Sequence, residues 1–528
     1  MNPELVNGTH MDIALVPRPA ELTVLPGRFA IPAAVNLQAG PGAERPAALL
    51  AEFLGPDRPR TADSAPIRLE LRQAPNNSGS ESYALEIHPT HVTLTSPSES
   101  GLFYGVQTLR QLLPPDARSW PCLSVHDAPR LPWRGALLDV ARHYMPPAFL
   151  RRFIDLLALH KLNVLHLHLT DDQGWRIEID GLPRLTWVGA WRAESMIGPA
   201  GSDRFDSKPH GGFYTQAELR TLVRYADDRG VRVVPEIEMP GHARAALAAY
   251  PHLGNDAARR LPVWTSWGVS EDIFGVHDGA LEFCREVLGQ TIDVFPDRYI
   301  HIGGDECPTT QWETAPAARR RVRELGLAAP AELHGWFLGR LRDFLVANGR
   351  RAVCWDETGH ASGELPADLA LTAWRDPVHG LRAVRRGHQV IMAPHLSTYF
   401  DYPQRDHPDE PQGHPESVTT LEDVYRFDPL AGGLPVADPA SADPGVLGAQ
   451  AQLWTEFAPT PEHVEYLAFP RLCALAEVAW SDGPREFAEF RGRLVRHAGL
   501  LRRLGVSVAA RIDEPRAPTL PAAETMDS

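Results

Sequence analysis

The sequence is poor in cysteine and has neither a long apolar run nor an excess of basic residues. Its five cysteines are odd in number, lie far apart and include no C-x-x-C pair, so we expect neither a disulfide framework nor a structural zinc site. Because no stretch of 18 apolar residues occurs, no transmembrane helix is expected. The first residues lack the basic and apolar segments of a secretory signal, and a cytoplasmic location is therefore expected.

Acidic residues outnumber basic ones, and the formal net charge is −15. This charge argues against nucleic acid or a membrane surface as the main partner. The 528 residues, of which 43% are hydrophobic, exceed the size of one small domain and suit a large barrel with an added domain. The sequence predicts no cofactor and leaves the oligomeric state open, with a homodimer as one option.

Residues 1–130 are typical of a small α+β domain. Three stretches alternate apolar and polar side chains, as half-buried strands do: residues 67–71, 83–89 and 91–97. Residues 100–115 have the pattern of an amphipathic helix that two prolines terminate. The proline-rich segment 126–135 is the expected linker to the next domain.

Residues 131–482 alternate short apolar runs with amphipathic segments of helical length. The eight runs are 135–140, 163–169, 232–238, 299–304, 352–357, 369–374, 389–394 and 446–454. The helical segments between them are 147–161, 215–229, 279–294, 330–348 and 377–387. This alternation predicts a closed (β/α)8 barrel, an α/β fold. The alternative is a doubly wound open sheet, which would need a glycine-rich turn after the first strand, and residues 139–147 contain no glycine.

Two further helices are expected near the end of the sequence, at 461–480 and 484–504. The barrel should therefore be followed by a helical extension over residues 483–515. The composition of residues 516–528 is typical of a disordered tail.

Acids, aromatic residues and one arginine follow the eight runs. In (β/α)8 enzymes the chemistry lies at the carboxyl ends of the strands. Flat aromatic rings pack on the apolar face of a sugar, and carboxylates and arginine bind its hydroxyls, so the pattern favours a carbohydrate. The residues concerned are Arg142, His143, Asp171, Asp172, Trp175, Glu238, His242, Asp305, Glu306, Trp355, Asp356, Glu357, Trp374, Tyr399, Asp401, Trp454 and Glu456.

Two other chemistries can be weighed on the same residues. His166 and His168 share one face of a strand, as in some barrel metallohydrolases. The later strand ends carry mostly acids and tryptophans, which makes paired polar groups inside the barrel the better interpretation. A nucleophilic Cys307 would need an activating base that the sequence does not identify.

Several segments together resemble the β-N-acetylhexosaminidases of glycoside hydrolase family 20. They are LDVARH (138–143), HLHLTDDQGWR (166–176), VVPEIEMPGH (233–242), YIHIGGDE (299–306) and LWTE (453–456), with GLFYGVQTLRQLL (101–113) in the smaller domain. The family's fold is a (β/α)8 barrel preceded by a small α+β domain, which agrees with the pattern above. The resemblance implies an exo-acting enzyme that removes terminal β-linked N-acetylhexosamine from an oligosaccharide or glycoconjugate.

The resemblance also implies a substrate-assisted reaction, a known exception to the two-carboxylate scheme of most glycosidases. Glu306 would protonate the leaving oxygen and later deprotonate the attacking water. Asp305 would stay ionised, bond to the acetamido N–H and stabilise an oxazolinium ion. We expect the two side chains to point apart, as neighbours in an extended chain do, and the charge of Asp305 to raise the pKa of Glu306.

Further positions match residues that bind the sugar in the family. Arg142 matches the residue that holds the 3- and 4-hydroxyls, with Glu456 opposite, and Asp401 matches another hydroxyl contact. Tyr399 matches the donor to the acetamido oxygen. The walls of the acetamido pocket and the platform under the ring match three tryptophans: Trp355, Trp374 and Trp454.

Other matches concern support of the acid. Asp171 and His242 match polar positions near Glu306. Glu238 stands where several relatives have aspartate, and we expect it to orient His242. The segment 407–425 lacks a tryptophan that some relatives carry there, which leaves the contacts of a second sugar open.

Two other functions compete with the hydrolase. A non-catalytic carbohydrate-binding protein on the same barrel should have lost the acid, yet Glu306 is present. A metallohydrolase would lose activity in a chelator. One axial hydroxyl separates N-acetylglucosamine from N-acetylgalactosamine, and both stay open as substrates.

Overall fold

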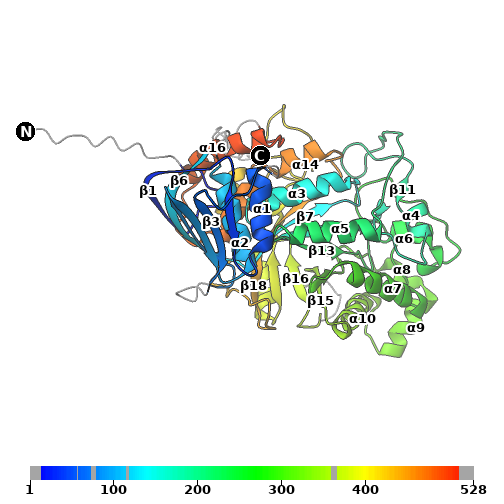
Figure 1. Cartoon of the computed structure of the whole chain (residues 1–528). Coiled ribbons are helices and arrows are strands. Elements are labelled where there is room, and N and C mark those ends of the chain that lie inside the picture. Colours follow the sequence, from blue (N-terminus) through cyan, green and yellow to red (C-terminus); the bar gives the residue numbers. More distant parts are fainter. Residues whose placement is uncertain (1–12, 56–57, 73–78, 114–117, 358–364, 510–528) are drawn as a thin grey trace, which may run out of the picture.

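The computed structural model describes residues 13–55, 58–72, 79–113, 118–357 and 365–509. The predicted tail at 516–528, and the prolines expected to end the helix at 100–115, lie outside these residues. Figure 1 shows an N-terminal sheet with its helices on one side and a larger barrel surrounded by helices on the other. The predicted α+β domain followed by a barrel is confirmed.

The N-terminal unit is a six-stranded sheet in the order β1-β6-β4-β5-β3-β2, with helices α1 and α2 between it and the barrel (Figure 1). Its elements are β1 Glu21–Ala30, β2 Asn36–Ala39, α1 Glu44–Leu54, β3 Pro66–Leu71, β4 Tyr83–His88, β5 His91–Ser96, α2 Glu99–Gln111 and β6 Ser119–Asp127. The three predicted strands are β3, β4 and β5, and the predicted helix is α2. Strand β1 was not predicted because most of its residues are exposed, so its sequence has no clear alternation.

Eight parallel strands close into a barrel in the order β13-β14-β15-β16-β17-β18-β7-β8. They are β7 Trp133–Asp139, β8 Val164–His168, β13 Arg232–Glu236, β14 Tyr299–His301, β15 Arg351–Trp355, β16 Ala370–Ala373, β17 Gln389–Met392 and β18 Gly445–Leu453. Each strand lies within or overlaps one of the predicted runs. The open doubly wound sheet is therefore wrong.

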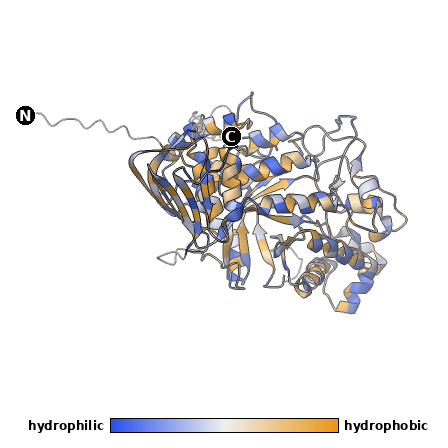
Figure 2. Ribbon diagram, in the orientation of Figure 1, coloured by the Kyte–Doolittle hydropathy of each residue, from blue (hydrophilic) through white to orange (hydrophobic). Residues whose placement is uncertain are grey.

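Helices cover the outside of the barrel, with their apolar faces toward the strands (Figure 2). The five predicted between strands are α3 Pro147–Leu159, α5 Gln216–Asp227, α7 Asp278–Val294, α10 Leu333–Ala347 and α11 Pro377–Arg385. The short elements are β9 Thr170–Asp171, β10 Gly174–Trp175, α4 Arg184–Trp187, β11 Trp191–Arg192, β12 His210–Gly211, α6 Arg244–Ala249, η1 Pro251–Leu253, α8 Thr310–Thr314, α9 Pro316–Leu325, η2 Pro330–Glu332, α12 His395–Thr398 and α13 Leu421–Arg426.

The chain after the barrel differs in one detail from the prediction. A single helix was expected at 461–480, but the structure has α14 Pro461–Ala468 and α15 Arg471–Trp480. Pro470 separates them, because proline has no N–H to donate to the preceding turn. The last helix, α16 Phe487–Arg503, agrees with the helix expected at 484–504.

The barrel interior is apolar at one end and polar at the other. Side chains of a strand alternate between its two faces, so Leu165 and Leu167 of β8 pack outward with the helices, while Val164 belongs to the cluster inside the barrel. This cluster is Trp133, Val164, Val234, Tyr299, Val353, Ala370, Ile391, Ala437 and Leu447, near the amino ends of the strands. It forms a packed base beneath the polar carboxyl ends, here called the barrel mouth.

The N-terminal unit is attached to the barrel end opposite the mouth. Lys161, just before β8, places Nζ 2.8 Å from Oδ2 of Asp127 in β6, and Trp480 Nε1 donates to Oδ1 of the same aspartate at 2.9 Å. Arg134, at the start of β7, pairs with Glu81 at 3.0 Å. The domain therefore leaves the mouth uncovered.

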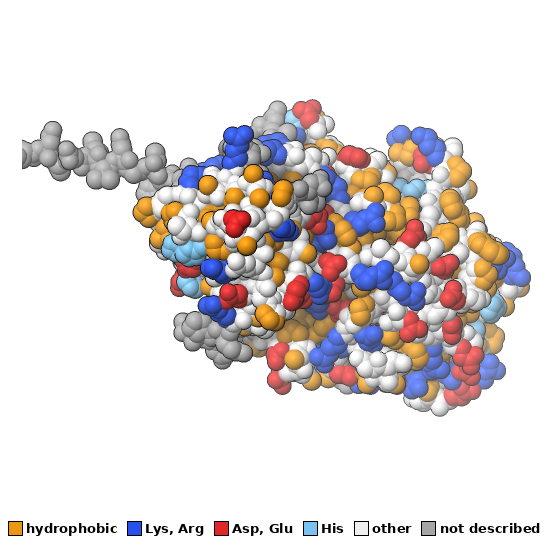
Figure 3. All heavy atoms as spheres, viewed as in Figure 1, with side chains coloured by type: hydrophobic (Ala, Val, Ile, Leu, Met, Phe, Trp, Pro, Cys, Tyr) orange, Lys and Arg blue, Asp and Glu red, His pale blue; other side chains and the backbone are white. Residues whose placement is uncertain are grey.

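The described helices include none that combines the length and apolar character needed to cross a lipid bilayer. On the face drawn in Figure 3, acidic and basic side chains are interspersed.

Candidate active site

The loop after β14 presents the paired acids on a strained turn. Gly303 and Gly304 have φ angles of 65° and 96°, and Glu306 has a φ of 43°. Glycine adopts this left-handed region easily, whereas other residues rarely do. A β carbon on Gly303 would lie 1.7 Å from Oε2 of Glu238. The glycines thus allow the chain to turn closely past the end of β13 and to carry Asp305 and Glu306 over the mouth.

Asp305 and Glu306 converge on one imidazole nitrogen. Nε2 of His242 lies 3.8 Å from Oδ2 of Asp305 and 3.7 Å from Oε2 of Glu306. The expectation that the two side chains point apart is wrong, because Glu306 has left-handed and not extended backbone. Both carboxyl groups therefore lie within ion-pair distance of the same ring.

His242 is held by two buried aspartates. Its Nδ1 lies 3.1 Å from Oδ1 of Asp171 and 3.4 Å from Oδ2 of Asp172. Burial alone would lower the pKa of His242, but the charge of Asp171 and the hydrogen bonds to Asp171, Asp172 and Glu306 together outweigh it and raise this pKa well above the ordinary value. This shift favours the cationic form of His242 beside the acid pair, and the structure places the ring near Glu306 as predicted.

The pKa values of the two acids stand in the opposite order to the one expected from the sequence. Burial, with the negative charge of Glu306, raises the pKa of Asp305 to about 7 although the charge of His242 opposes this. Burial would also raise the pKa of Glu306, but the interaction with His242 prevails and lowers it. The expectation of a raised Glu306 pKa is therefore wrong for the protein without substrate, in which Asp305 holds the proton more strongly.

Arg142 lies on the same side of the mouth as Asp171 and Glu456. Its Nη2 is 2.8 Å from Oδ2 of Asp171, and its Nη1 is 3.4 Å from Oδ2 of Asp139 and 3.8 Å from Oε1 of Glu456. The guanidinium also lies over the ring of Trp454, 5.1 Å from its centroid. These contacts hold the guanidinium of Arg142 in one orientation, and the side chain is only 9% exposed.

Four aromatic residues from four strand ends form one wall. The rings of Trp374 and Tyr399 stack with centroids 6.2 Å apart and 12° between their planes. The ring of Trp454 lies edge-on to Tyr399 at 6.2 Å and 5.7 Å from Trp355. The structure thus brings the predicted tryptophans and tyrosine together.

Asp401 lies buried beside this wall. Its Oδ1 has no hydrogen-bond partner among the described residues. Burial and the charge of Glu456 raise its pKa well above the ordinary value, which favours a neutral carboxylic acid. Burial likewise raises the pKa of Glu456, although Arg142 opposes the shift.

Glu238 does not have the predicted role. Neither of its carboxylate oxygens has a hydrogen-bond partner among the described residues, and His242 is oriented by Asp171 and Asp172 instead. Burial and the charge of Asp305 raise the pKa of Glu238 well above the ordinary value. It lies instead against Gly303, where the chain turns toward the acid pair.

Glu236 is a buried acid that the sequence analysis missed. Its carboxylate accepts a hydrogen bond from Nε1 of Trp355 at 2.7 Å and lies 2.6 Å from Nδ1 of His168 and 2.7 Å from Nδ1 of His301. Glu236 therefore fixes the orientation of the Trp355 ring. The signal was an acid inside the otherwise apolar run VVPE.

The two histidines of β8 lie with Glu236 in groups whose ligand atoms are within 4.8 Å of one another, and both rings have polar partners. His168 is paired with Glu236 and with Asp171 at 3.0 Å, and Nδ1 of His166 accepts from Gln450 at 2.9 Å. Both histidines are thus the paired polar groups that the sequence favoured. Burial raises the pKa of Cys307, which opposes formation of a nucleophilic thiolate.

Comparison with known proteins places both units in one family. The model for the catalytic domain of glycosyl hydrolase family 20 matches residues 131–483, and the model for domain 2 of that family matches residues 12–128. The chain is 35% identical over 506 residues to a beta-hexosaminidase of Porphyromonas gingivalis, covering 91% of this chain but 62% of that protein. It is 34% identical over 519 residues to a beta-N-acetylhexosaminidase of Cellulomonas fimi, covering 94% and 95%.

Solved structures agree over nearly the whole chain. An exo beta-N-acetylglucosaminidase of Vibrio harveyi, in complex with N-acetylglucosamine, superposes with a TM-score of 0.84 and 32% identity over 94% of this chain and 78% of that one. An N-acetyl-beta-hexosaminidase of Streptomyces plicatus gives 0.80 and 33% over 96% and 97%. Since two thirds of the residues fall within the catalytic-domain model, the chain belongs to glycosyl hydrolase family 20.

Proposed function

We propose that this protein is an exo-acting, retaining β-N-acetylhexosaminidase. It releases terminal β-linked N-acetylglucosamine or N-acetylgalactosamine from an oligosaccharide or glycoconjugate. The observation that carries the proposal is the convergence of Asp305 and Glu306 on Nε2 of His242, at 3.8 and 3.7 Å, beside the aromatic wall. The names of the relatives and of the Vibrio harveyi complex support the same class of substrate.

The state of the other acids at the mouth favours a nucleophile from the substrate. Ordinary retaining glycosidases need a second, ionised carboxylate across the sugar from the acid, about 5–5.5 Å away. Asp171 is already bonded to Arg142 and His242. Burial raises the pKa of Asp401 and of Glu456. These states support the carbonyl oxygen of the substrate's own 2-acetamido group as the nucleophile, in the substrate-assisted reaction that the resemblance to family 20 implies.

In the first step the acetamido oxygen bonds to the anomeric carbon while the glycosidic C–O bond breaks. Glu306 gives its proton to the leaving oxygen. Asp305 accepts a hydrogen bond from the acetamido N–H, and the positive charge that forms on the oxazolinium ring favours its ionised form. The proton that Asp305 holds in the free protein thus passes to Glu306 in the productive complex, and His242 lies next to both.

In the second step water attacks the same carbon from the side that the leaving group vacated. Glu306, now a carboxylate, takes the proton of this water, and the bond to the acetamido oxygen breaks. Two displacements at one carbon give overall retention. His242 stabilises the Glu306 carboxylate between the steps, since it is cationic and 3.7 Å away.

A pair of substrates tests the proposal directly. Nitrophenyl N-acetyl-β-glucosaminide should be hydrolysed, whereas nitrophenyl β-glucoside, which lacks the acetamido group, should react negligibly. Fluorination of the acetamido methyl weakens the carbonyl nucleophile and should slow the reaction progressively. A thiazoline analogue of the cyclic intermediate should inhibit competitively. Equal rates for the two glycosides would contradict the proposal.

Replacement of Arg142 by Lys should raise KM and lower kcat/KM. Lysine keeps the charge but loses the planar fork that reaches two hydroxyls, and charge-assisted hydrogen bonds of this kind are worth about 1.5–3 kcal/mol, or roughly 10–100-fold. Steady-state kinetics on nitrophenyl N-acetyl-β-glucosaminide measure the effect. Arg340→Lys, on the exposed face of α10, is the matched control, and equal kinetics for the two variants would place Arg142 outside the site.

A further inference from the structure

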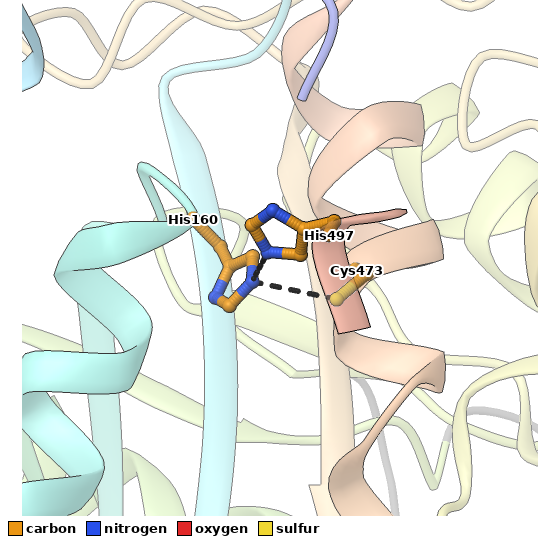
Figure 4. A group of neighbouring side chains, drawn as sticks. All are labelled: His160, Cys473 and His497. Carbon is orange, nitrogen blue, oxygen red and sulfur yellow. Dashed lines mark hydrogen bonds between the residues drawn. The ribbon is translucent and has the colours of Figure 1, made fainter. Parts of the chain in front are cut away.

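Two histidines and a cysteine meet in the buried interior of the protein (Figure 4). His160 follows the last residue of α3, a few residues before β8 begins, and so lies near the amino ends of the strands. Cys473 belongs to α15 and His497 to α16. All three are at most 2% exposed. None of them takes part in the proposed reaction.

The three side chains direct their metal-binding atoms at one point. Nε2 of His160 lies 2.9 Å from Nε2 of His497 and 3.4 Å from Sγ of Cys473, and all three atoms lie within 4.8 Å of one another. With Zn–N bonds of about 2.0–2.1 Å and Zn–S bonds of about 2.3 Å, tetrahedral ligands stand roughly 3.3–3.4 Å apart for two nitrogens and roughly 3.5–3.6 Å apart for nitrogen and sulfur. Small side-chain adjustments therefore suffice to enclose an ion.

Hydrogen bonding alone leaves this cluster unsatisfied. Nδ1 of His160 lies 2.7 Å from the carbonyl oxygen of Leu156, so this nitrogen carries the proton and Nε2 presents its lone pair to the cluster. If the proton of His497 is on Nε2, its Nδ1 is a buried acceptor without a donor, because this atom has no hydrogen bond among the described residues and the backbone group beside the ring is the Ala14 carbonyl, which cannot donate. If the proton is on Nδ1, the two Nε2 lone pairs face each other at 2.9 Å, and only the thiol proton of Cys473, 3.4 Å from Nε2 of His160, can lie between them. Either arrangement leaves one buried lone pair without a hydrogen, which costs free energy.

A bound cation resolves the conflict. It would accept both imidazole lone pairs and the thiolate of Cys473, whose proton is released to solvent on binding. The bond from Nδ1 of His160 to the Leu156 carbonyl, 2.7 Å long, is the outer contact that orients a metal-binding histidine.

We propose that His160, Cys473 and His497 form a structural site for a thiophilic metal ion, Cu⁺ or Zn²⁺. One thiolate and two imidazoles are ligands that both ions accept. Cu⁺ would make the buried site electrically neutral with three ligands, whereas Zn²⁺ would leave one positive charge and a fourth position. By joining α3, α15 and α16, the ion stabilises the helices behind the barrel and takes no part in catalysis.

Metal binding by the full chain tests the site. Protein treated with a chelator and then dialysed should bind one equivalent of Zn²⁺ or, under anaerobic reducing conditions, of Cu⁺, measured by elemental analysis. The apparent melting temperature should rise on binding, while kcat/KM for nitrophenyl N-acetyl-β-glucosaminide should change less than twofold. Cys473→Ala should lose the bound equivalent. Cys284→Ala, which removes another buried thiol, is the matched control and should retain it.

Cobalt provides a test that needs no variant. Co²⁺ added to the wild-type chain should give thiolate-to-metal absorption, and Zn²⁺ should displace it. Stoichiometric binding of either Cu⁺ or Zn²⁺ by the wild type and by Cys284→Ala supports the site. Absence of thiolate-to-cobalt absorption, together with no bound Cu⁺ or Zn²⁺ on wild-type protein that is folded and active, overturns it.

Discussion

Replacement of Glu306 by Gln should reduce kcat/KM by about 10²–10⁴-fold for substrates with a sugar or alkyl leaving group. Glutamine keeps the shape of the side chain but cannot donate the proton that such a leaving oxygen needs. A dinitrophenyl leaving group departs without protonation, so the loss of rate for the first step should nearly vanish for that substrate. A plot of log kcat/KM against leaving-group pKa, for wild type and variant, measures the difference.

The control for this variant is Glu313→Gln. Glu313 lies on α8, a few residues after the acid pair, and is exposed, so its substitution should leave the kinetics at the wild-type level. Equal losses in Glu306→Gln across all leaving groups would show that Glu306 acts in binding or folding and not as the acid.

Replacement of Asp305 by Asn should abolish most activity whatever the leaving group. Asparagine still offers an oxygen to the acetamido N–H, but it lacks the charge that stabilises the oxazolinium ion. Loss of one such preorganised electrostatic contact typically costs about 10²–10³-fold in kcat. The variant should therefore be slow with dinitrophenyl and alkyl glycosides alike, unlike Glu306→Gln. A covalent glycosyl adduct on a carboxylate, detected by mass spectrometry of trapped wild-type enzyme, would instead indicate an ordinary enzymic nucleophile.

The pH profile of the Asp305→Asn variant should also change. The pair must keep one proton for catalysis, and the group that holds it most strongly in the free protein has a pKa of about 7. Wild-type kcat/KM should therefore fall as the pH rises above about 7. In Asp305→Asn only Glu306 titrates, and His242 lowers its pKa, so the fall should move to lower pH. A basic limb that stays near pH 7 would assign it to another group, because kinetics report the pair as a whole.

Local periodicity was sufficient to predict the barrel. A strand such as β8 reveals itself through Val164, His166 and His168 on one face and leucines on the other, and such patterns do not depend on distant residues. Strand β1 was not predicted because its side chains are mostly exposed, so its sequence does not alternate between apolar and polar residues. The end of α14 before Pro470 was not predicted, because apolar residues continue on both sides of the proline.

The members of the site could be predicted from their position at strand ends, but their electrostatics could not. Asp305 and Glu306 are adjacent in sequence, which suggested that Asp305 stays ionised and that its charge raises the pKa of Glu306. The relative order of their pKa values depends on His242, and the charge of His242 depends on Asp171 from a different strand. Interactions of this kind arise when the barrel closes, so no local pattern contains them.

Closure of the barrel has a consequence for how the chain folds. Strand β18 pairs with β7 along six residues, so the first and last strands of the barrel become neighbours only after the entire sequence between them has been synthesised. Until then β7 and β17 each have a bare edge with unpaired N–H and C=O groups. Such long-range pairing gives a high contact order and slow folding, and partly folded chains with open edges are prone to aggregate. During synthesis, the chain therefore stays prone to aggregation until the segment that carries Trp454 and Glu456 has left the ribosome.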